Sequence, residues 1–213
     1  VMSLRATSDR VAITGLGLLS SLGDDPNRFF EALLAGESGL GPLALFPRPE
    51  GTSESIRVGE VRAFEPERYL GERNLRPLDR TSRLLCSAAA RALDDAALGN
   101  EARVGLDVGL VVGTTYCSLR TIAEFDRRGQ KLGPGYASPL DFSNSVINAA
   151  AGQAAIWFGL TGVNATIASG EASGLQAIAY AADLIASGQA DAIVAGGAEE
   201  LAPESYLAYA RAG

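Results

Sequence analysis

The 213-residue sequence has no histidine, two cysteines and no long apolar run. Without histidine, the chain has no imidazole of its own for proton transfer near neutral pH. The two cysteines, Cys86 and Cys117, occur in a chain with no other sign of secretion. They therefore predict reduced thiols and a cytoplasmic location. No segment reaches about 18 consecutive apolar residues, so we expect none to span a bilayer.

Positive charge is scarce as well. Lys and Arg number 18 against 25 Asp and Glu, which gives a formal net charge of −7. Such a chain has no sequence-wide positive field, so nucleic acid and anionic membrane surfaces are not expected partners. Apolar residues make up 47% of the sequence, which is enough to build a core for one large domain or two small ones.

Strand-like and helix-like segments alternate along the chain. Apolar runs bounded by glycine predict strands over 10–20, 104–114, 163–169 and 190–200. Helical spacing of apolar residues and capping signals predict helices over 26–36, 79–99, 143–160 and 171–188. Residues 37–80 predict an irregular surface excursion, and residues 129–141 a polar loop. The alternation indicates an α/β fold with a sheet buried on both faces.

The stretch "TIASGEASGLQA", residues 166–177, predicts the end of a strand, a tight turn and a helix that opens on Glu171. A helix N-terminus favours an anion by about 0.3–1 kcal/mol, because its amide groups are unpaired and its dipole is positive there. Small residues at Ala172, Gly174, Ala177 and Ala179 let other backbones approach this helix closely. We therefore expect it at the centre of a layered fold.

Four stretches resemble, in order and spacing, the N-terminal half of the β-ketoacyl-acyl-carrier-protein synthases. They are "RVAITGLGLLSSLG", "VVGTTYCSL", "SVINAAAGQAAIWFGLTG" and "VNATIASGEASGLQAIAYAADLIASGQADAIVAGGAEE". The resemblance implies a thiolase-like layered α/β fold, in which one domain over residues 1–213 holds a mixed sheet covered by helices. The family's first half has one more strand after the point where this sequence stops, so that strand is expected to be missing.

Active members of this family place a nucleophilic cysteine in a pattern like A-C-[AST]-[ST]-G. The matching residues here are Gly170, Glu171, Ala172, Ser173 and Gly174, so Glu171 replaces the cysteine. A glutamate would form at best a mixed anhydride with an acyl group, and water would hydrolyse it before an extender arrived. The family also uses two histidines from its C-terminal half, and this sequence has none. The resemblance therefore implies a protein that is not catalytic alone.

Chain-length factors of type II polyketide and aryl-polyene synthases are the subfamily that this sequence is most similar to in character. They have lost the cysteine, often to glutamine, and pair with an active ketoacyl synthase to shape the acyl tunnel. This resemblance implies an active synthase and an acyl carrier protein as partners, with a separate C-terminal half chain as a third possibility. It implies no cofactor or metal, since the acyl chain arrives on the phosphopantetheine of the carrier.

Two alternatives to that role stay open. The chain could decarboxylate malonyl-carrier to an acetyl primer, using Glu171 together with histidines from another chain. It could instead be an inactive fragment of a longer synthase.

The resemblance also implies roles for residues outside the turn. Tyr116 matches the place where the family gates or lengthens the acyl pocket, although a core tyrosine is an equal alternative. Helix 142–158 and strand 163–168 resemble the family's dimer contact, where Gly152 permits tight packing and Asn148 and Gln153 can hydrogen-bond. Any buried alanine-rich helix would give a similar pattern.

Three further patterns admit simpler explanations. Gly15 and Gly17 follow a strand-like run, but Ser20 stands where a dinucleotide-binding G-x-G-x-x-G motif has its third glycine. Cys117 could be a replacement nucleophile, but a small buried residue is the better interpretation, and Cys86 is expected to be structural. Six arginines between Arg62 and Arg83 could dock an acidic carrier, but the carboxylates among them favour a solvated face with local ion pairs.

Overall fold

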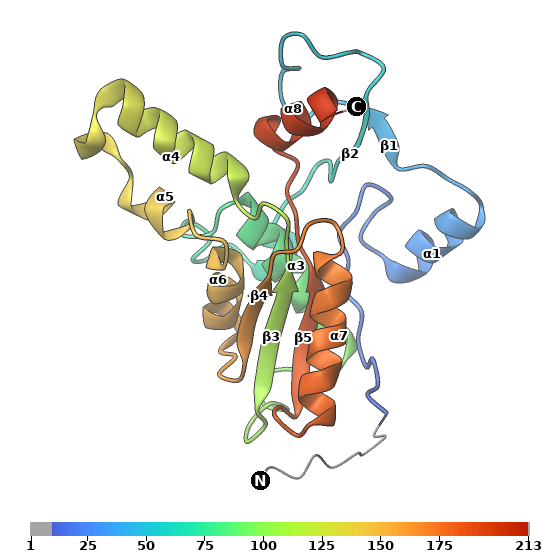
Figure 1. The fold of residues 1–213 in the computed structure, drawn as a ribbon. Helices are drawn as coiled ribbons and strands as arrows, with labels where there is room; N and C mark the ends of the chain where they lie inside the picture. The colour runs from blue at the N-terminus through green and yellow to red at the C-terminus, as the bar shows by residue number, and fades with distance from the viewer. Residues whose placement is uncertain (1–9, 213) are drawn as a thin grey trace.

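A computed structural model describes residues 10–212 of the chain. Its centre is a parallel three-stranded sheet in the order β4-β3-β5. The strands are β3 (Val108–Gly113), β4 (Asn164–Ile167) and β5 (Ala192–Gly197). Helices cover both faces of this sheet (Figure 1). The predicted thiolase-like layering is confirmed.

The sheet's middle strand sends alternate side chains into two separate cores. Val108, Leu110 and Val112 pack on one face against α3 (Arg80–Asp95) and α6 (Ala149–Phe158). Val111 packs on the other face against Ala177, Ala181 and Leu184 of α7 (Ser173–Ala186). All six residues of β3 are buried, as expected for a parallel strand that is covered on both sides.

The remaining elements surround this layered body. On the N-terminal side lie α1 (Pro26–Leu34), β1 (Leu40–Pro42), β2 (Arg57–Gly59) and α2 (Glu67–Leu70). An arm of α4 (Leu119–Leu132), η1 (Pro134–Tyr136) and α5 (Pro139–Ser143) projects away from the sheet (Figure 1). The last helix, α8 (Pro203–Ala212), lies beyond the carboxyl ends of the strands (Figure 1).

The strand predicted over residues 10–20 is wrong. None of these described residues belongs to a strand longer than an isolated bridge, which Ser20 makes with Gly23. The segment instead packs against α3, where Cβ atoms added to Gly15 and Gly17 would come within 2.3 and 2.0 Å of helix carbonyl oxygens. Its glycines therefore serve close packing on a helix, which explains them without a dinucleotide site.

The bounds of two other helices also differ from the predicted ones. The helix predicted over 143–160 begins only at Ala149, and the helix predicted over 79–99 ends at Asp95. The helices α4 and α8 were not predicted at all. Within residues 37–80, β1 and β2 pair antiparallel, so this excursion contains a small sheet of its own. No helix among residues 10–212 is long and apolar enough to cross a membrane.

Candidate functional site

Three loops meet where the parallel strands end. The loop after β4 carries Glu171, the loop after β3 carries Tyr116, and the segment after β5 carries Glu199 and Glu200. Because the strands are parallel, these loops share the carboxyl edge of the sheet, which is where open α/β sheets usually bind ligands.

Ser173 shapes the turn that carries Glu171. Its hydroxyl accepts a hydrogen bond from the Ser169 amide at 2.9 Å and donates one to the Gly170 carbonyl. Gly170 has a φ of 77°, a conformation that glycine adopts without strain. The helix α7 begins at Ser173, two residues after Glu171, so the prediction that Glu171 opens the helix is wrong. Glu171 itself is exposed.

The turn sits tightly against the strand ends because three glycines meet there. A Cβ atom on Gly113 would lie 2.2 Å from the backbone of Ser173. Gly174 and Gly197 also face each other, since a Cβ on Gly197 would lie 3.2 Å from the Gly174 Cα. The predicted close approach of other backbones to this helix is confirmed.

Glu199 holds the loop that carries Tyr116. Its Oε2 atom accepts hydrogen bonds from the Thr114 hydroxyl at 3.1 Å, the Thr115 amide at 2.6 Å and the Tyr116 amide at 3.1 Å. The Cys117 amide donates in turn to the Thr114 hydroxyl at 2.8 Å. Glu199 was not among the residues predicted for the site, although an acidic pair one residue after the glycines that end a strand was a usable signal.

Tyr116 is partly exposed and meets a second tyrosine from α8. The rings of Tyr116 and Tyr209 are edge-to-face, with centroids 6.2 Å apart and planes at 75°. Nothing in the sequence pattern singled out Tyr209.

Both thiols are buried and poorly suited to nucleophilic chemistry. Burial raises the pKa of Cys86 to about 12. Burial also raises the pKa of Cys117, outweighing the hydrogen bond from Ser118 that opposes the shift. Since the thiolate is the nucleophilic form, neither group is activated. The expectation that both cysteines are small buried residues is confirmed.

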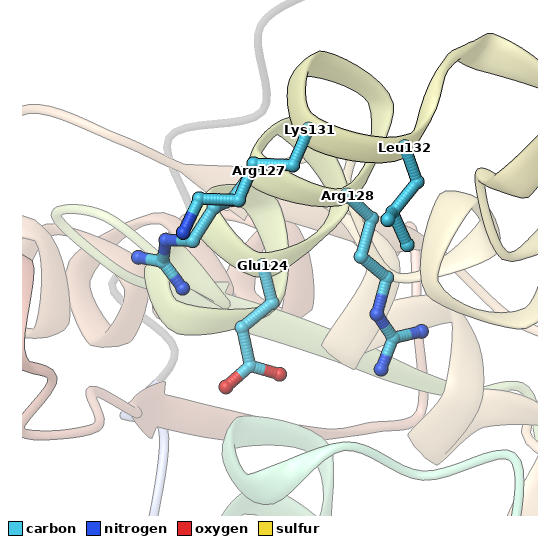
Figure 2. Close-up of a pocket in the computed structure, with 5 residues that line it drawn as sticks. All are labelled: Glu124, Arg127, Arg128, Lys131 and Leu132. Atoms are coloured by element: carbon cyan, nitrogen blue, oxygen red, sulfur yellow. The ribbon is translucent and has the colours of Figure 1, made fainter.

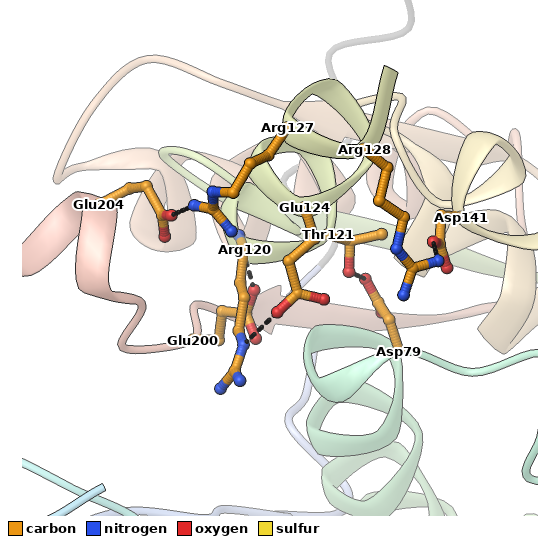
Figure 3. Close-up of polar contacts among 9 residues, drawn as sticks. All are labelled: Asp79, Arg120, Thr121, Glu124, Arg127, Arg128, Asp141, Glu200 and Glu204. Carbon is orange, nitrogen blue, oxygen red and sulfur yellow. Dashed lines mark hydrogen bonds and ion pairs between the residues drawn. The ribbon is translucent and has the colours of Figure 1, made fainter. Parts of the chain in front are cut away.

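A buried carboxylate, Glu200, and a partly buried one, Asp79, lie near the site. Glu200 accepts a hydrogen bond from the Arg120 amide at 3.3 Å, and Asp79 accepts one from Thr121 at 3.1 Å (Figure 3). Burial first, and then the nearby Asp79 charge, raise the pKa of Glu200 to about 7. The guanidinium groups of Arg80 and Arg120 only partly offset these effects.

The residues predicted for a dimer contact lie in α6 and directly before it. Asn148 is exposed just before the helix, and a Cβ on Gly152 would meet no atom within 4 Å. Gln153 donates to the buried Asn144 side chain at 3.5 Å, so its amide is partly used inside the chain. The adjoining strand β4 pairs with β3 on one side, and its other edge has no strand partner among residues 10–212.

The arginines between Arg62 and Arg83 mostly serve the chain's own structure. Arg62, Arg80 and Arg83 donate to backbone carbonyls of Pro42, Val61 and Leu75, respectively. Arg68 lies over the Tyr69 ring. Glu60, counted among the solvated carboxylates, is in fact buried and accepts from two backbone amides. Most of the other charged residues in this stretch are exposed, and Arg62 forms an ion pair with Glu60 at 2.9 Å, so the expected solvated face with local ion pairs is confirmed apart from the burial of Glu60.

A cationic surface lies instead on the projecting helix α4. Arg127, Arg128 and Lys131 line a hollow of about 390 Å³ on this helix, together with Glu124 and Leu132 (Figure 2). Arg127 pairs with Glu204 and Arg128 with Asp141, each at 3.0 Å (Figure 3). Lys131 has no ion-pair partner among the described residues, so at least one cation is free for an outside group.

Comparisons with known proteins agree with this geometry. The family model described as "Beta-ketoacyl synthase, N-terminal domain" matches residues 8–213. The 3-oxoacyl-acyl-carrier-protein synthase 2 of Vibrio cholerae serotype O1 is 35% identical over 196 residues, which cover 90% of this chain and 46% of the relative. The chain thus spans about half the length of the curated relatives it matches.

Two solved structures share the fold. The ishigamide ketosynthase/chain length factor aligns with a TM-score of 0.84 and 26% identity over 94% of this chain and 50% of its own. A type II PKS acyl-carrier protein in complex with its ketosynthase bound to the hexaketide aligns with a TM-score of 0.77 and 25% identity. That alignment covers 94% of this chain and 48% of the other.

Proposed function

This chain belongs to the β-ketoacyl synthase family and carries its N-terminal domain, and we propose that it is a chain-length-factor-like subunit or half-subunit without condensing activity of its own. It pairs with an active ketoacyl synthase and shapes the acyl tunnel in fatty acid, polyketide or polyene biosynthesis. The C-terminal half of the fold comes either from this polypeptide beyond residue 213 or from a separate chain.

Glu171 is the observation that carries this proposal. It occupies the turn between β4 and α7, at the position of the family's nucleophile, and it is exposed at the carboxyl edge of the sheet. A carboxylate there cannot store an acyl group as a thioester, and the two thiols of the chain are buried elsewhere. The chain therefore measures or positions an acyl group that another subunit holds.

Exchanging the carboxylate for a thiol tests this assignment. Glu171→Cys should become acylated by an acyl-carrier thioester, because a thiol next to the α7 N-terminus is a nucleophile where the carboxylate is not. Intact-mass measurement should show one stable acyl adduct on this variant and none on the wild type. Glu72→Cys, which places a thiol at another exposed glutamate, is the matched control and should stay unmodified.

Three results would contradict the proposal. A long-lived acyl adduct on the wild-type chain, or carbon–carbon bond formation by it alone, would show a working nucleophile. Failure of Glu171→Cys to react would remove Glu171 from the nucleophile position. Acetyl-carrier that accumulates from malonyl-carrier with the wild type, and not with Glu171→Ala, would favour the decarboxylase instead.

The carrier protein docks on α4 in this proposal, since carriers are acidic and α4 presents the cations that line the hollow of Figure 2. Charge complementarity of this kind mainly raises the rate of encounter. Lys131→Glu should slow acylation of the Glu171→Cys variant by the carrier and leave its reaction with a free acyl-pantetheine unchanged. Arg28→Glu makes the same charge change on α1, and it should change neither rate.

A further inference from the structure

A second hollow, of about 500 Å³, lies at the edge of the sheet opposite to the turn that carries Glu171. Asn100, Arg103 and Val104 line it together with residues 156–159 at the end of α6. The first three belong to the loop that leads into β3, and the end of α6 leads into β4. The hollow therefore lies where the parallel strands begin, away from the loops that follow their carboxyl ends.

Uncharged oxygen atoms hold Arg103 in place at this hollow. Its guanidinium donates to the backbone carbonyls of Leu98 and Phe158, each at 2.6 Å, and to the side-chain oxygen of Asn100 at 2.5 Å. These bonds use three of the five N–H groups of an arginine, so two remain for another acceptor. Because the head group is already ordered, a ligand that binds it avoids much of the entropy cost of fixing a long side chain.

The charge of Arg103 is only partly compensated within the described chain. Arg103 forms no ion pair among residues 10–212, although the exposed carboxylates of Glu101 and Asp107 are close to it in the sequence. Phe158 is the last residue of α6, and a helix C-terminus carries about half a unit of negative charge. About half of the guanidinium charge is thus left over. Guanidinium groups bind carboxylates through paired hydrogen bonds, so a carboxylate is the anion that suits this position.

Apolar side chains at the same hollow are exposed to solvent. Val104 is 82% exposed and Ile156 is 80% exposed, the two highest values among the large apolar residues that the structure describes. Trp157 lies beside them, partly buried against the core. Tryptophan and arginine are enriched among the residues that contribute most to protein–protein binding, and exposed aliphatic groups next to them gain from being covered.

We propose that this hollow is a docking surface for a segment of a partner protein that carries a carboxylate between apolar side chains. The carboxylate accepts hydrogen bonds from the remaining N–H groups of Arg103, and its apolar neighbours cover Val104 and Ile156. A protein segment suits the hollow better than a small carboxylate, because only a segment covers apolar groups on both lining segments at once. The surface does not involve Glu171, so it stands or falls independently of the proposed function.

Trp157 makes the test specific, because it is the single tryptophan of the chain and it lines the hollow. Its emission is followed in the full chain during titration with acetyl-Leu-Glu-Leu-amide, and acetyl-Leu-Gln-Leu-amide is the uncharged control. We expect the glutamate peptide to shift the emission and to bind about fivefold more tightly than the glutamine peptide. The difference should shrink at high salt, which screens the new ion pair.

Three substitutions locate the binding. Val104→Asp puts a competing carboxylate next to Arg103 and should weaken binding of the glutamate peptide by at least about tenfold. Leu34→Asp makes the same change at a 73% exposed position of α1 and should leave binding unchanged. Arg103→Gln should bind the two peptides equally. Val104 and Leu34 are exposed, so those two variants decide the question even where Arg103→Gln does not fold.

Four results would overturn the proposal. The first is equal affinity of the wild type for the two peptides, or no change in Trp157 emission with either. The second is a loss of affinity in Leu34→Asp as large as that in Val104→Asp. The third is butanoate binding as tightly as the glutamate peptide, which would indicate a small-molecule site. The fourth is an emission shift that follows protein concentration without peptide, which would place a second copy of this chain on the hollow.

Discussion

Glu200 is a carboxylate whose ionisation the fold opposes. Its pKa is about 7 in the folded chain, against an ordinary value of 4.5, because burial and the Asp79 charge disfavour the ionised form. Between these two values the folded chain keeps a proton that the unfolded chain releases. The free energy of unfolding therefore decreases as the pH rises from about 4.5 to about 7, and it levels off above that.

Replacing this carboxylate by an amide should abolish that decrease. Glu200→Gln keeps an acceptor for the Arg120 amide and removes the buried charge. Above about pH 7 we expect it to be more stable than the wild type by up to about 3 kcal/mol, and below about pH 5 the difference should vanish. Urea unfolding followed across this pH range measures the effect.

Glu60 provides a control with the opposite sign. Burial opposes its ionisation, but hydrogen bonds from Ala44 and Leu45 and the charge of Arg62 outweigh it, so the pKa of Glu60 is lowered. Its contribution to stability is present above its ordinary pKa and is lost as the pH falls through the folded-state value. Glu60→Gln should therefore destabilise the chain at neutral pH. Equal pH profiles for Glu200→Gln and the wild type would contradict the burial argument.

The sequence located some site residues and not others for a physical reason. Glu171 and Tyr116 stand in short motifs next to strand ends, where one pattern fixes both the backbone and the position. Tyr209 contacts Tyr116 through the packing of α8, although 93 residues separate the two tyrosines in the sequence. A contact between residues so far apart in the sequence depends on tertiary structure, so a short sequence motif cannot predict it.

At the scale of elements, the start of α7 packs directly against the end of β3, where Gly113 leaves no room for a side chain. Gly113→Ala places a methyl group 2.2 Å from the Ser173 backbone, which cannot yield without moving the turn. We expect a loss of at least about 2 kcal/mol in the free energy of unfolding. The same change in a Glu171→Cys background should abolish acylation of the new thiol, because the turn no longer presents it.

Gly174→Ala is the matched control for that substitution. Its methyl group would lie 3.4 Å from the Gly197 Cα, an ordinary contact, and alanine favours the helix over glycine by up to about 1 kcal/mol. This variant should be as stable as the wild type or more so. A Gly113→Ala protein that unfolds at the wild-type urea concentration would show that α7 is seated less tightly than the structure describes.

Apart from α1, the elements that the sequence predicted belong to the parallel sheet or pack against it. For α3, α6, α7 and β3, burial imposes an apolar pattern that local reasoning can detect. By contrast, α4 projects as an arm and has no buried residue. Its apolar residues Leu119, Ile122 and Phe125 recur at helical spacing, a signal that the prediction missed. The segment 10–20 has the composition of a strand but lies along a helix, and composition cannot distinguish these two surroundings.

At the scale of the whole molecule, the described chain leaves surfaces that isolated proteins usually cover. Both β4 and β5 pair with β3 alone within residues 10–212, so each presents an open edge. Apolar side chains are also exposed on α7, with Leu175 at 75% and Ile178 at 43%. These surfaces fit a domain that belongs to a larger assembly.

The open edge of β4 is where the proposed subunit contact can be tested. Leu110 lies in β3, and its amide donates to the carbonyl of Val163. Thr114 directly follows β3, and its amide donates to the carbonyl of Ile167. Because successive residues of a strand alternate in direction, the amides of Asn164 and Thr166 point away from β3, toward the open edge. A second strand that extends the sheet across a twofold axis would need these two donors.

Thr166→Pro removes one of these donors and leaves the bonds to β3 in place, since proline is tolerated on edge strands. We expect it to weaken association with the partner synthase, or with a second copy, by at least about tenfold. Thr166→Val keeps the donor and removes a hydroxyl that is buried without a partner, so it should associate normally. Sedimentation velocity across a concentration series measures both. Equal association of the two variants would place the subunit contact elsewhere, and Asn148, Gly152 and Gln153 of the adjoining α6 segment would then lose their predicted role.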